Sequence, residues 1–156
     1  MLGMRLNSDY DVLVLGAGLS GIGAACHLSR SCPSIRYGII EQRDRIGGTW
    51  DIFRYPGIRS DSDMFKLGYN FCPWKDIKML ADGPSIRQYI DDTANEHNVK
   101  NNIMFGKKIS KINWSSENNY WSVTMIDQQS KKESTLTSAF VFSCTGYYNY
   151  EKGYTP

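Results

Sequence analysis

Residues 11–25 constrain the fold of this chain more than any other stretch. They read Asp-Val-Leu-Val-Leu-Gly-Ala-Gly-Leu-Ser-Gly-Ile-Gly-Ala-Ala. The apolar run 12–15 is typical of a central parallel strand that is covered on both faces. Gly16, Gly18 and Gly21 follow with the spacing G-x-G-x-x-G. This spacing predicts a sharp turn out of the strand, a backbone that a ligand can approach closely, and a helix packed tightly on the strand.

The residues on either side of this glycine turn complete a strand–helix–strand unit. We expect a helix over residues 19–31 and a second strand over residues 35–41, ending in Glu41. Glu41 follows Gly21 by about 20 residues, the position from which a carboxylate binds the ribose of a dinucleotide. The helix N-terminus would direct unpaired N–H groups at the pyrophosphate. The order of these features predicts a dinucleotide site; the alternative is a small-residue helix packed on a strand beside a solvated Glu41.

Composition narrows the class of protein. The chain has 156 residues, enough for one domain with a core, and its formal net charge of +2 is spread along the sequence. A nucleic-acid partner would need a concentrated basic face, so none is expected. The four cysteines have no C-x-x-C spacing and are accompanied by two histidines, which argues against a metal site. We see no secretory signal or membrane span, and unpaired cysteines fit a reducing cytoplasm.

Residues 42–63 form a long irregular stretch rich in Gly, Pro, Arg, Asp and aromatic residues. Segments of this kind inside a compact domain are usually functional or disordered, and so many aromatic residues disfavour disorder. Gly47 and Gly48 permit close backbone approach, and Trp50 offers a flat apolar surface. We therefore expect a loop that folds over a ligand.

The second half of the chain predicts a return to the sheet through an antiparallel insertion. Short helical patterns cover residues 64–71 and 85–97, and a short strand is expected over 103–105. Three strand-like stretches separated by polar turns predict a meander: residues 107–114, 120–126 and 132–137. The apolar run 140–144 should rejoin the parallel sheet, followed by Thr145 and Gly146, where backbone could approach the ligand.

The glycine motif alone does not separate NAD from FAD, but the meander does not fit a simple repeat of βαβ units. The chain resembles the FAD-binding domain of flavoproteins with two dinucleotide domains. Residues 47–50, 54–61 and 144–148 narrow the resemblance to the flavin-containing monooxygenases, and within them to the Baeyer–Villiger branch. Residues 47–63 and 146–150 are most similar to the ethionamide-activating type. The resemblance implies an α/β Rossmann-like FAD-binding domain, in which a parallel sheet with helices carries a three-stranded antiparallel meander.

The resemblance also implies site residues. Gly16, Gly18 and Gly21 would hold the FAD pyrophosphate, Glu41 the adenosine ribose, and the backbone of Ile109 the adenine. The full set of implied cofactor-binding residues is Gly16, Gly18, Leu19, Ser20, Gly21, Glu41, Gln42, Gly48, Thr49, Trp50, Asp61, Ile109, Thr145 and Gly146.

Other residues of this set would lie nearer the flavin. Residues 48–50 would follow the pyrophosphate toward the ring, and residues 145–146 would close over the cofactor. Asp61 would lie beside the flavin where the nicotinamide arrives, which makes it the candidate catalytic residue. Members of the family use NADPH to reduce FAD, and a C4a-peroxyflavin then oxygenates a small-molecule ketone, sulfur or nitrogen centre.

The chain departs from the family in length. A second G-x-G-x-x-G and a linking F-x-G-x-x-x-H pattern do not occur, and the active-site arginine of the Baeyer–Villiger branch would lie beyond Pro156. We therefore expect a disordered leader over residues 1–9 and a truncated FAD-binding domain over 10–156, with the NADPH domain absent. Such a piece is expected to be inactive alone.

Two other readings remain open from the sequence. One is a degenerate, non-enzymatic module that binds FAD weakly. The other is a small NAD(P)-dependent dehydrogenase domain, which is disfavoured because no catalytic Tyr/Lys or His/Asp pair stands out. In the preferred reading a missing domain would leave apolar surface exposed, which predicts self-association.

Overall fold

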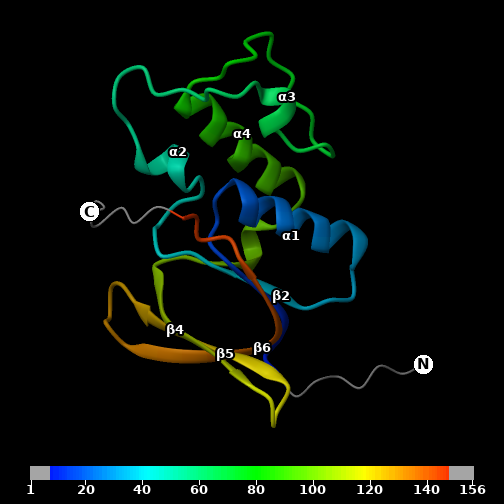
Figure 1. The fold of residues 1–156 in the computed structure, drawn as a ribbon, viewed down its shortest axis with the longest axis vertical. Helices are drawn as coiled ribbons and strands as arrows, with labels where there is room; N and C mark the ends of the chain where they lie inside the picture. Colours follow the sequence, from blue (N-terminus) through cyan, green and yellow to red (C-terminus); the bar gives the residue numbers. More distant parts are fainter. Residues whose placement is uncertain (1–7, 148–156) are drawn as a thin grey trace.

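The fold was analysed in a computed structural model that describes residues 8–147 (Figure 1). A six-stranded sheet runs in the order β3-β2-β1-β6-β5-β4. The strand pairs β1–β2, β2–β3 and β1–β6 are parallel, whereas β4–β5 and β5–β6 are antiparallel. The strands are β1 (Tyr10–Leu15), β2 (Tyr37–Ile40), β3 (Ile103–Met104), β4 (Lys107–Ser115), β5 (Tyr120–Asp127) and β6 (Glu133–Ser143).

Helices cover one face of the parallel strands, and the meander packs against the other (Figure 1). Within β1, Val12 and Val14 pack against the helices, whereas Leu13 and Leu15 pack against the meander. This alternation confirms that the first apolar run is a central strand buried on both faces. The helices are α1 (Leu19–Ser31), α2 (Thr49–Ile52), α3 (Met64–Leu67), α4 (Gly83–Glu96) and the 3₁₀ turn η1 (Lys100–Asn102).

The last strand differs from expectation. The sequence predicted two strands over 132–137 and 140–144, but β6 is one continuous strand. Its first part pairs with β5 up to Ser138, and its second part pairs with β1 up to Ser143. Residues 138–139 are Ser-Ala, and neither is a Gly or Pro that would interrupt a strand. One strand therefore joins the meander to the parallel sheet.

Smaller corrections concern helix ends and the loop. The predicted helix 64–71 stops at Leu67, and the helix expected from residue 85 starts at Gly83, because Asp82 accepts the amide of Ser85 and caps it. The loop 42–63 contains α2, which no helical period in the sequence had indicated.

The predicted leader falls mostly outside the described residues, as do residues 148–150 of the C-terminal motif. The last two residues of the expected leader, Ser8 and Asp9, form hydrogen bonds with the folded domain. The Asp9 carboxylate accepts a hydrogen bond from the Thr137 amide at 2.8 Å, and the Arg36 guanidinium donates to the carbonyl oxygens of Ser8 and Asp9. We therefore propose that Ser8 and Asp9, which the sequence assigned to the leader, belong to the folded domain.

Candidate dinucleotide-binding site

The carboxyl ends of three parallel strands meet at the glycine turn. The Gly16 amide donates to the Ile40 carbonyl at the end of β2, at 2.8 Å, and the Cys144 amide donates to the Leu15 carbonyl at 2.9 Å. In open α/β sheets, ligands bind in the crevice beyond such strand ends.

The three glycines of the turn have different structural roles. Gly16 has φ +105°, and a Cβ atom there would lie 2.6 Å from the Cys144 carbonyl oxygen. A Cβ atom on Gly21 would lie 1.8 Å from the Gly16 carbonyl oxygen. Gly18 is different, because a Cβ atom there would meet Gly48 Cα at an ordinary contact distance of 3.6 Å. The fold itself requires Gly16 and Gly21, whereas Gly18 leaves space beside the backbone.

The N-terminus of α1 has no side-chain cap. Its cap residue is Gly18, whereas α3 and α4 are capped by the carboxylates of Asp63 and Asp82. An uncapped helix start presents backbone N–H groups and the positive end of the helix dipole to an anion. Leu19 and Ser20 form the first positions of α1. This end fits the pyrophosphate of a dinucleotide.

Glu41 follows β2 and is buried, with an exposed fraction of 6%. Its Oε2 accepts the Ala17 amide and its Oε1 accepts the Arg43 amide, both at 2.8 Å. The carboxylate is therefore fixed beside the glycine turn, and each oxygen keeps a lone pair for a ribose hydroxyl. Gln42, beside it, is exposed.

The loop after Glu41 returns to the glycine turn. The Gly47 amide donates to the Ala17 carbonyl at 3.1 Å, and Gly48 has φ +54°. A Cβ atom on Gly48 would lie 3.1 Å from Gly18 Cα, so these two glycine backbones face one another closely. Thr49 and Trp50 continue from there into α2. The structure thus brings residues 48–50 together with the glycine turn.

Asp51 is a residue of this loop that sequence reasoning missed. It is 1% exposed, and its carboxylate binds Arg43 at 2.7 Å and Arg54 at 2.8 Å. Burial by itself would raise the pKa of Asp51, but hydrogen bonds from the two guanidinium groups outweigh it and hold the pKa below its ordinary value. These ion pairs tie together the two ends of the segment 43–54 that carries Gly48. The i,i+3 spacing of Asp51 and Arg54 was the one signal in the sequence.

Three predicted residues lie on neighbouring elements. Thr145 and Gly146 follow the end of β6 and are exposed, with φ +78° at Gly146. Ile109 lies on β4, where it packs on the cluster that contains Leu13. The Lys107 amide donates to the Glu41 carbonyl at 2.9 Å, which places the start of β4 alongside the end of β2.

Asp61 lies on a different segment. It is exposed, and the residues beside it pair with residues 79–83: the Ser60 amide donates to the Ala81 carbonyl at 3.0 Å, and the Gly83 amide to the Ile58 carbonyl at 3.0 Å. The hydrogen bonds of its neighbours therefore hold this segment to the start of α4 and not to the glycine turn. Its role beside the flavin stays a prediction.

The described part of the chain has two pockets on different sides of α4. One, of about 650 Å3, lies between α2 and the start of α4 and is lined by Trp50 and by the cations Arg45, Arg54 and Arg87. It adjoins Gly47, since a Cβ atom there would lie 2.9 Å from Arg87 Cγ, and the Gly47 amide in turn binds the Ala17 carbonyl of the glycine turn. A basic, aromatic lining of this kind suits a planar ligand that carries phosphate.

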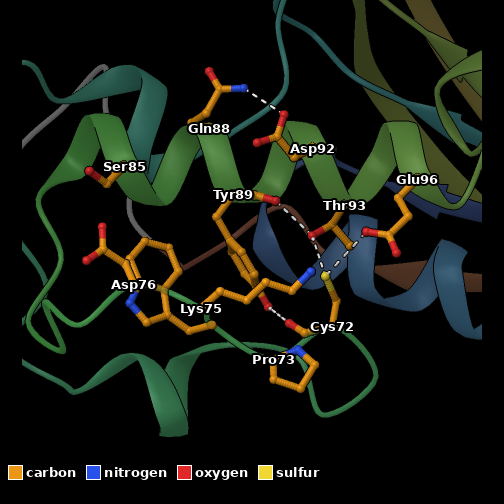
Figure 2. A pocket seen from close by; sticks show the side chains of 11 residues that line it. Cys72, Pro73, Lys75, Asp76, Ser85, Gln88, Tyr89, Asp92, Thr93 and Glu96 are labelled. Carbon is orange, nitrogen blue, oxygen red and sulfur yellow. Dashed lines mark hydrogen bonds between the residues drawn. The ribbon is translucent and has the colours of Figure 1, made fainter.

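The second hollow, of about 380 Å3, lies along another face of α4 (Figure 2). The Tyr89 hydroxyl donates to the Cys72 carbonyl at 2.6 Å, and the Thr93 hydroxyl donates to Cys72 Sγ at 3.5 Å. Figure 2 shows Cys72, Tyr89 and Thr93 joined by these hydrogen bonds, with Cys72 Sγ also bonded to Glu96 and Gln88 to Asp92. We assign this hollow no part in the dinucleotide site.

Some features are not found among residues 8–147. No group of three or more His, Cys, Asp or Glu side chains there is arranged to hold a metal ion, and no helix there has the length and apolarity to cross a membrane. The four cysteines are free thiols, and burial raises the pKa of Cys26 to about 11.

Fold and site together define a Rossmann-like dinucleotide-binding domain. Residues 14–73 match the family described as an NAD(P)-binding Rossmann-like domain. The chain superposes on the crystal structure of OTEMO in complex with FAD and NADP with a TM-score of 0.78, at 27% identity, covering 90% of this chain and 26% of OTEMO. The predicted α/β Rossmann-like fold is confirmed.

The sequence relatives are more specific. The chain is 52% identical, over 97% of its length, to MymA of Mycobacterium tuberculosis, which is named as an FAD-containing monooxygenase. It is 47% identical, again over 97% of its length, to the FAD-containing monooxygenase EthA of the same organism. In both cases it spans 30% of the relative's length. The resemblance to the flavin-containing monooxygenases is therefore confirmed: this chain is homologous to about a third of such an enzyme.

Proposed function

We propose that this chain binds FAD and forms the FAD-binding part of an NADPH-dependent flavoprotein monooxygenase. The observation that carries the proposal is the uncapped N-terminus of α1 beside Gly48 and Glu41. A glycine turn, an anion-binding helix end and a fixed carboxylate are the elements of a dinucleotide site on this fold. The names of the relatives favour FAD over a nicotinamide cofactor as the resident group.

Different residues of the site bind different parts of FAD. The amides at the start of α1, together with Gly18, bind the pyrophosphate, and Glu41 accepts the hydroxyls of the adenosine ribose. Residues 48–50 continue toward the flavin, and Ile109 lies on the adenine side. Thr145 and Gly146 cover the cofactor from the end of β6. Bound FAD, once reduced by NADPH, supplies the oxygen chemistry, whereas these residues bind and orient it.

We also propose a substrate class and a catalytic residue for the longer enzyme of which this chain would form a part. The oxygenated substrate is a small molecule, either a ketone in a Baeyer–Villiger reaction or a sulfur or nitrogen centre. Asp61 acts where the nicotinamide meets the flavin. Because the chain spans 30% of its relatives, we propose that it lacks activity by itself. We also propose a cytoplasmic location, where a reducing medium would keep the four thiols free.

The test is a titration of the purified chain with FAD, followed by visible absorption and flavin fluorescence. Gly18→Ala should keep the fold, because the added Cβ meets Gly48 Cα at 3.6 Å, but it should weaken FAD binding at least tenfold by occupying the space of the pyrophosphate. The control is Gly106→Ala, where the added Cβ meets nothing within 4 Å and only backbone strain is introduced.

Two results would contradict the proposal. One is FAD binding that Gly18→Ala leaves unchanged, and the other is binding of NADPH with no binding of FAD. The second result would favour a small nicotinamide-binding domain. Thermal unfolding of each variant without ligand separates a loss of the site from a loss of the fold.

A further inference from the structure

A tyrosine from the loop after α3 contacts the first turn of α1. The Tyr69 hydroxyl donates a hydrogen bond to the Leu19 carbonyl oxygen at 2.6 Å. Leu19 is the first residue of α1, and Tyr69 follows the last residue of α3 by two positions. The start of α1, which has no side-chain cap on its amides, therefore has a side-chain partner on the carbonyl side of its first turn.

The acceptor of this bond belongs to the anion-binding end of the helix. The Leu19 carbonyl and the Ser20 amide are the two halves of one peptide group. Ser20 is the second residue of α1, so its N–H is among those without a partner inside the helix. Linked hydrogen bonds polarise one another, so a proton donated to the Leu19 oxygen makes the Ser20 N–H a stronger donor. Tyr69 thus acts on an anion-binding amide through a single peptide group.

Gly23 allows the tyrosine ring to lie against the helix. A Cβ atom on Gly23 would lie 2.9 Å from Tyr69 Cε1, closer than such atoms approach in folded proteins. Gly23 is buried in the interior of α1 and is not one of the three glycines of the turn. An interior glycine weakens a helix relative to alanine. The contact with the Tyr69 ring gives this glycine a structural reason.

Neighbouring aromatic residues fix the ring of Tyr69. It stacks with Phe71 at a centroid separation of 5.0 Å and with Tyr89 of α4 at 5.5 Å. The Tyr69 amide also donates to the Tyr89 hydroxyl at 2.7 Å. Burial raises the pKa of Tyr69 well above its ordinary value, so the hydroxyl keeps its proton and stays a donor at neutral pH. The donor is therefore in place before any ligand binds.

We propose that Tyr69 is a positioning residue for the pyrophosphate of the bound dinucleotide and acts through the Leu19–Ser20 peptide group. Its hydroxyl holds the first turn of α1 in the orientation that presents the Ser20 N–H, and it strengthens that donor. The inference rests on the proposed FAD site. It assigns a part in cofactor binding to a residue that lies outside the glycine turn and the loop 42–54.

Tyr69→Phe tests the inference, because it keeps the stacked ring and removes the hydroxyl alone. Titration with FAD should show binding weakened by about three- to tenfold. In the ligand-free protein, the amide proton of Ser20 should move upfield in a nuclear magnetic resonance spectrum, because its peptide group is less polarised. A general loss of stability would not produce this shift.

The matched control is Tyr37→Phe, which removes a tyrosine hydroxyl from the other end of the same helix. Tyr37 Oη and Ser29 Oγ lie 2.9 Å apart in a hydrogen bond, and Ser29 is in the last turn of α1. This variant should keep both the FAD affinity and the Ser20 shift of the unsubstituted protein. Equal effects of the two substitutions would overturn the inference, as would FAD binding that Tyr69→Phe leaves unchanged. If the unsubstituted chain binds no FAD, the proposed function fails and this inference fails with it.

Gly23→Ala reaches the same contact from the helix side. The added Cβ displaces the ring of Tyr69, so this variant should also weaken FAD binding. The two changes together should weaken binding little more than either alone, because each removes the same hydrogen bond. Additive effects in the double variant would contradict a coupling through the Tyr69 hydroxyl.

Discussion

Glu41 Oε2 accepts the backbone amide of Ala17 at 2.8 Å, across the gap between the end of β2 and the glycine turn. The other oxygen of the same carboxylate accepts the Arg43 amide, also at 2.8 Å. One buried side chain thus joins the glycine turn to the start of the loop 42–54. Any ligand contact of Glu41 is set in position before the ligand arrives, so the binding site is largely preorganised.

Glu41→Gln tests this double role. A side-chain amide has one acceptor oxygen, so either the Ala17 or the Arg43 amide loses its partner, at a cost of about 1–3 kcal/mol. Urea unfolding of the ligand-free protein should show this loss, and FAD titration should show weaker binding by about tenfold. The matched control is Glu96→Gln on the exposed side of α4, which should change neither quantity. Unchanged stability together with unchanged FAD affinity would contradict the assignment.

Gly21→Ala is expected to disrupt the fold itself. The added Cβ would lie 1.8 Å from the Gly16 carbonyl oxygen, so α1 must move away from β1. We expect a loss of about 3 kcal/mol or more, measured by denaturant unfolding or seen as a collapse in soluble yield. Gly18→Ala is the comparison, because it adds the same methyl group one helical turn away without a clash. Similar stability of the two variants would show that the glycines do not differ in role.

The strand–turn–helix unit could be predicted closely because its signals are local. The apolar run of β1 and the spacing of Gly16, Gly18 and Gly21 depend on neighbours in the sequence, and α1 spans residues 19–31 as expected. The meander was likewise visible in its polar turns. The continuity of β6 was not, because Ser138 and Ala139 suggest a break in the pattern but do not impose one on the backbone.

The sequence predicted that the loop 42–63 is functional, but it did not predict the conformation of the loop. Its organisation depends on Asp51, whose two arginine partners are set by how the loop folds and not by any period in the sequence. For the same reason, no local pattern in the sequence indicated that the residues beside Asp61 pair with the start of α4. Long-range pairings of this kind follow from tertiary packing, which local propensity does not encode.

Asp82→Ala tests the start of α4. Asp82 Oδ1 accepts the Ser85 amide at 2.9 Å, and this bond together with one from Lys78 lowers the pKa of Asp82 to about 2. Removal of an aspartate N-cap typically costs about 1 kcal/mol, so the midpoint of denaturant unfolding should fall accordingly. The same substitution at Asp92, in the exposed middle of α4, should cost clearly less. An equal loss at both positions would mean that the cap contributes nothing specific.

Asp51→Asn should loosen the loop that presents Gly48. The variant keeps the shape of the side chain but loses the charge that binds Arg43 and Arg54, and we expect a loss of about 2 kcal/mol at pH 7, since hydrogen bonds between charged groups contribute more than neutral ones. Asp44→Asn is the control, because the carboxylate of Asp44 is 80% exposed and its pair with Arg45 lies in solvent.

The pH dependence gives the same substitution a sharper test. Because folding lowers the pKa of Asp51 below its ordinary value of 3.8, the stabilisation by its charge is complete above that value. It is lost as the pH falls through the lower, folded-state pKa. The difference in unfolding free energy between the two proteins should therefore be constant from pH 7 to about pH 5 and shrink below pH 4. A difference that stays constant down to pH 2 would show that the charge of Asp51 is not what holds the loop.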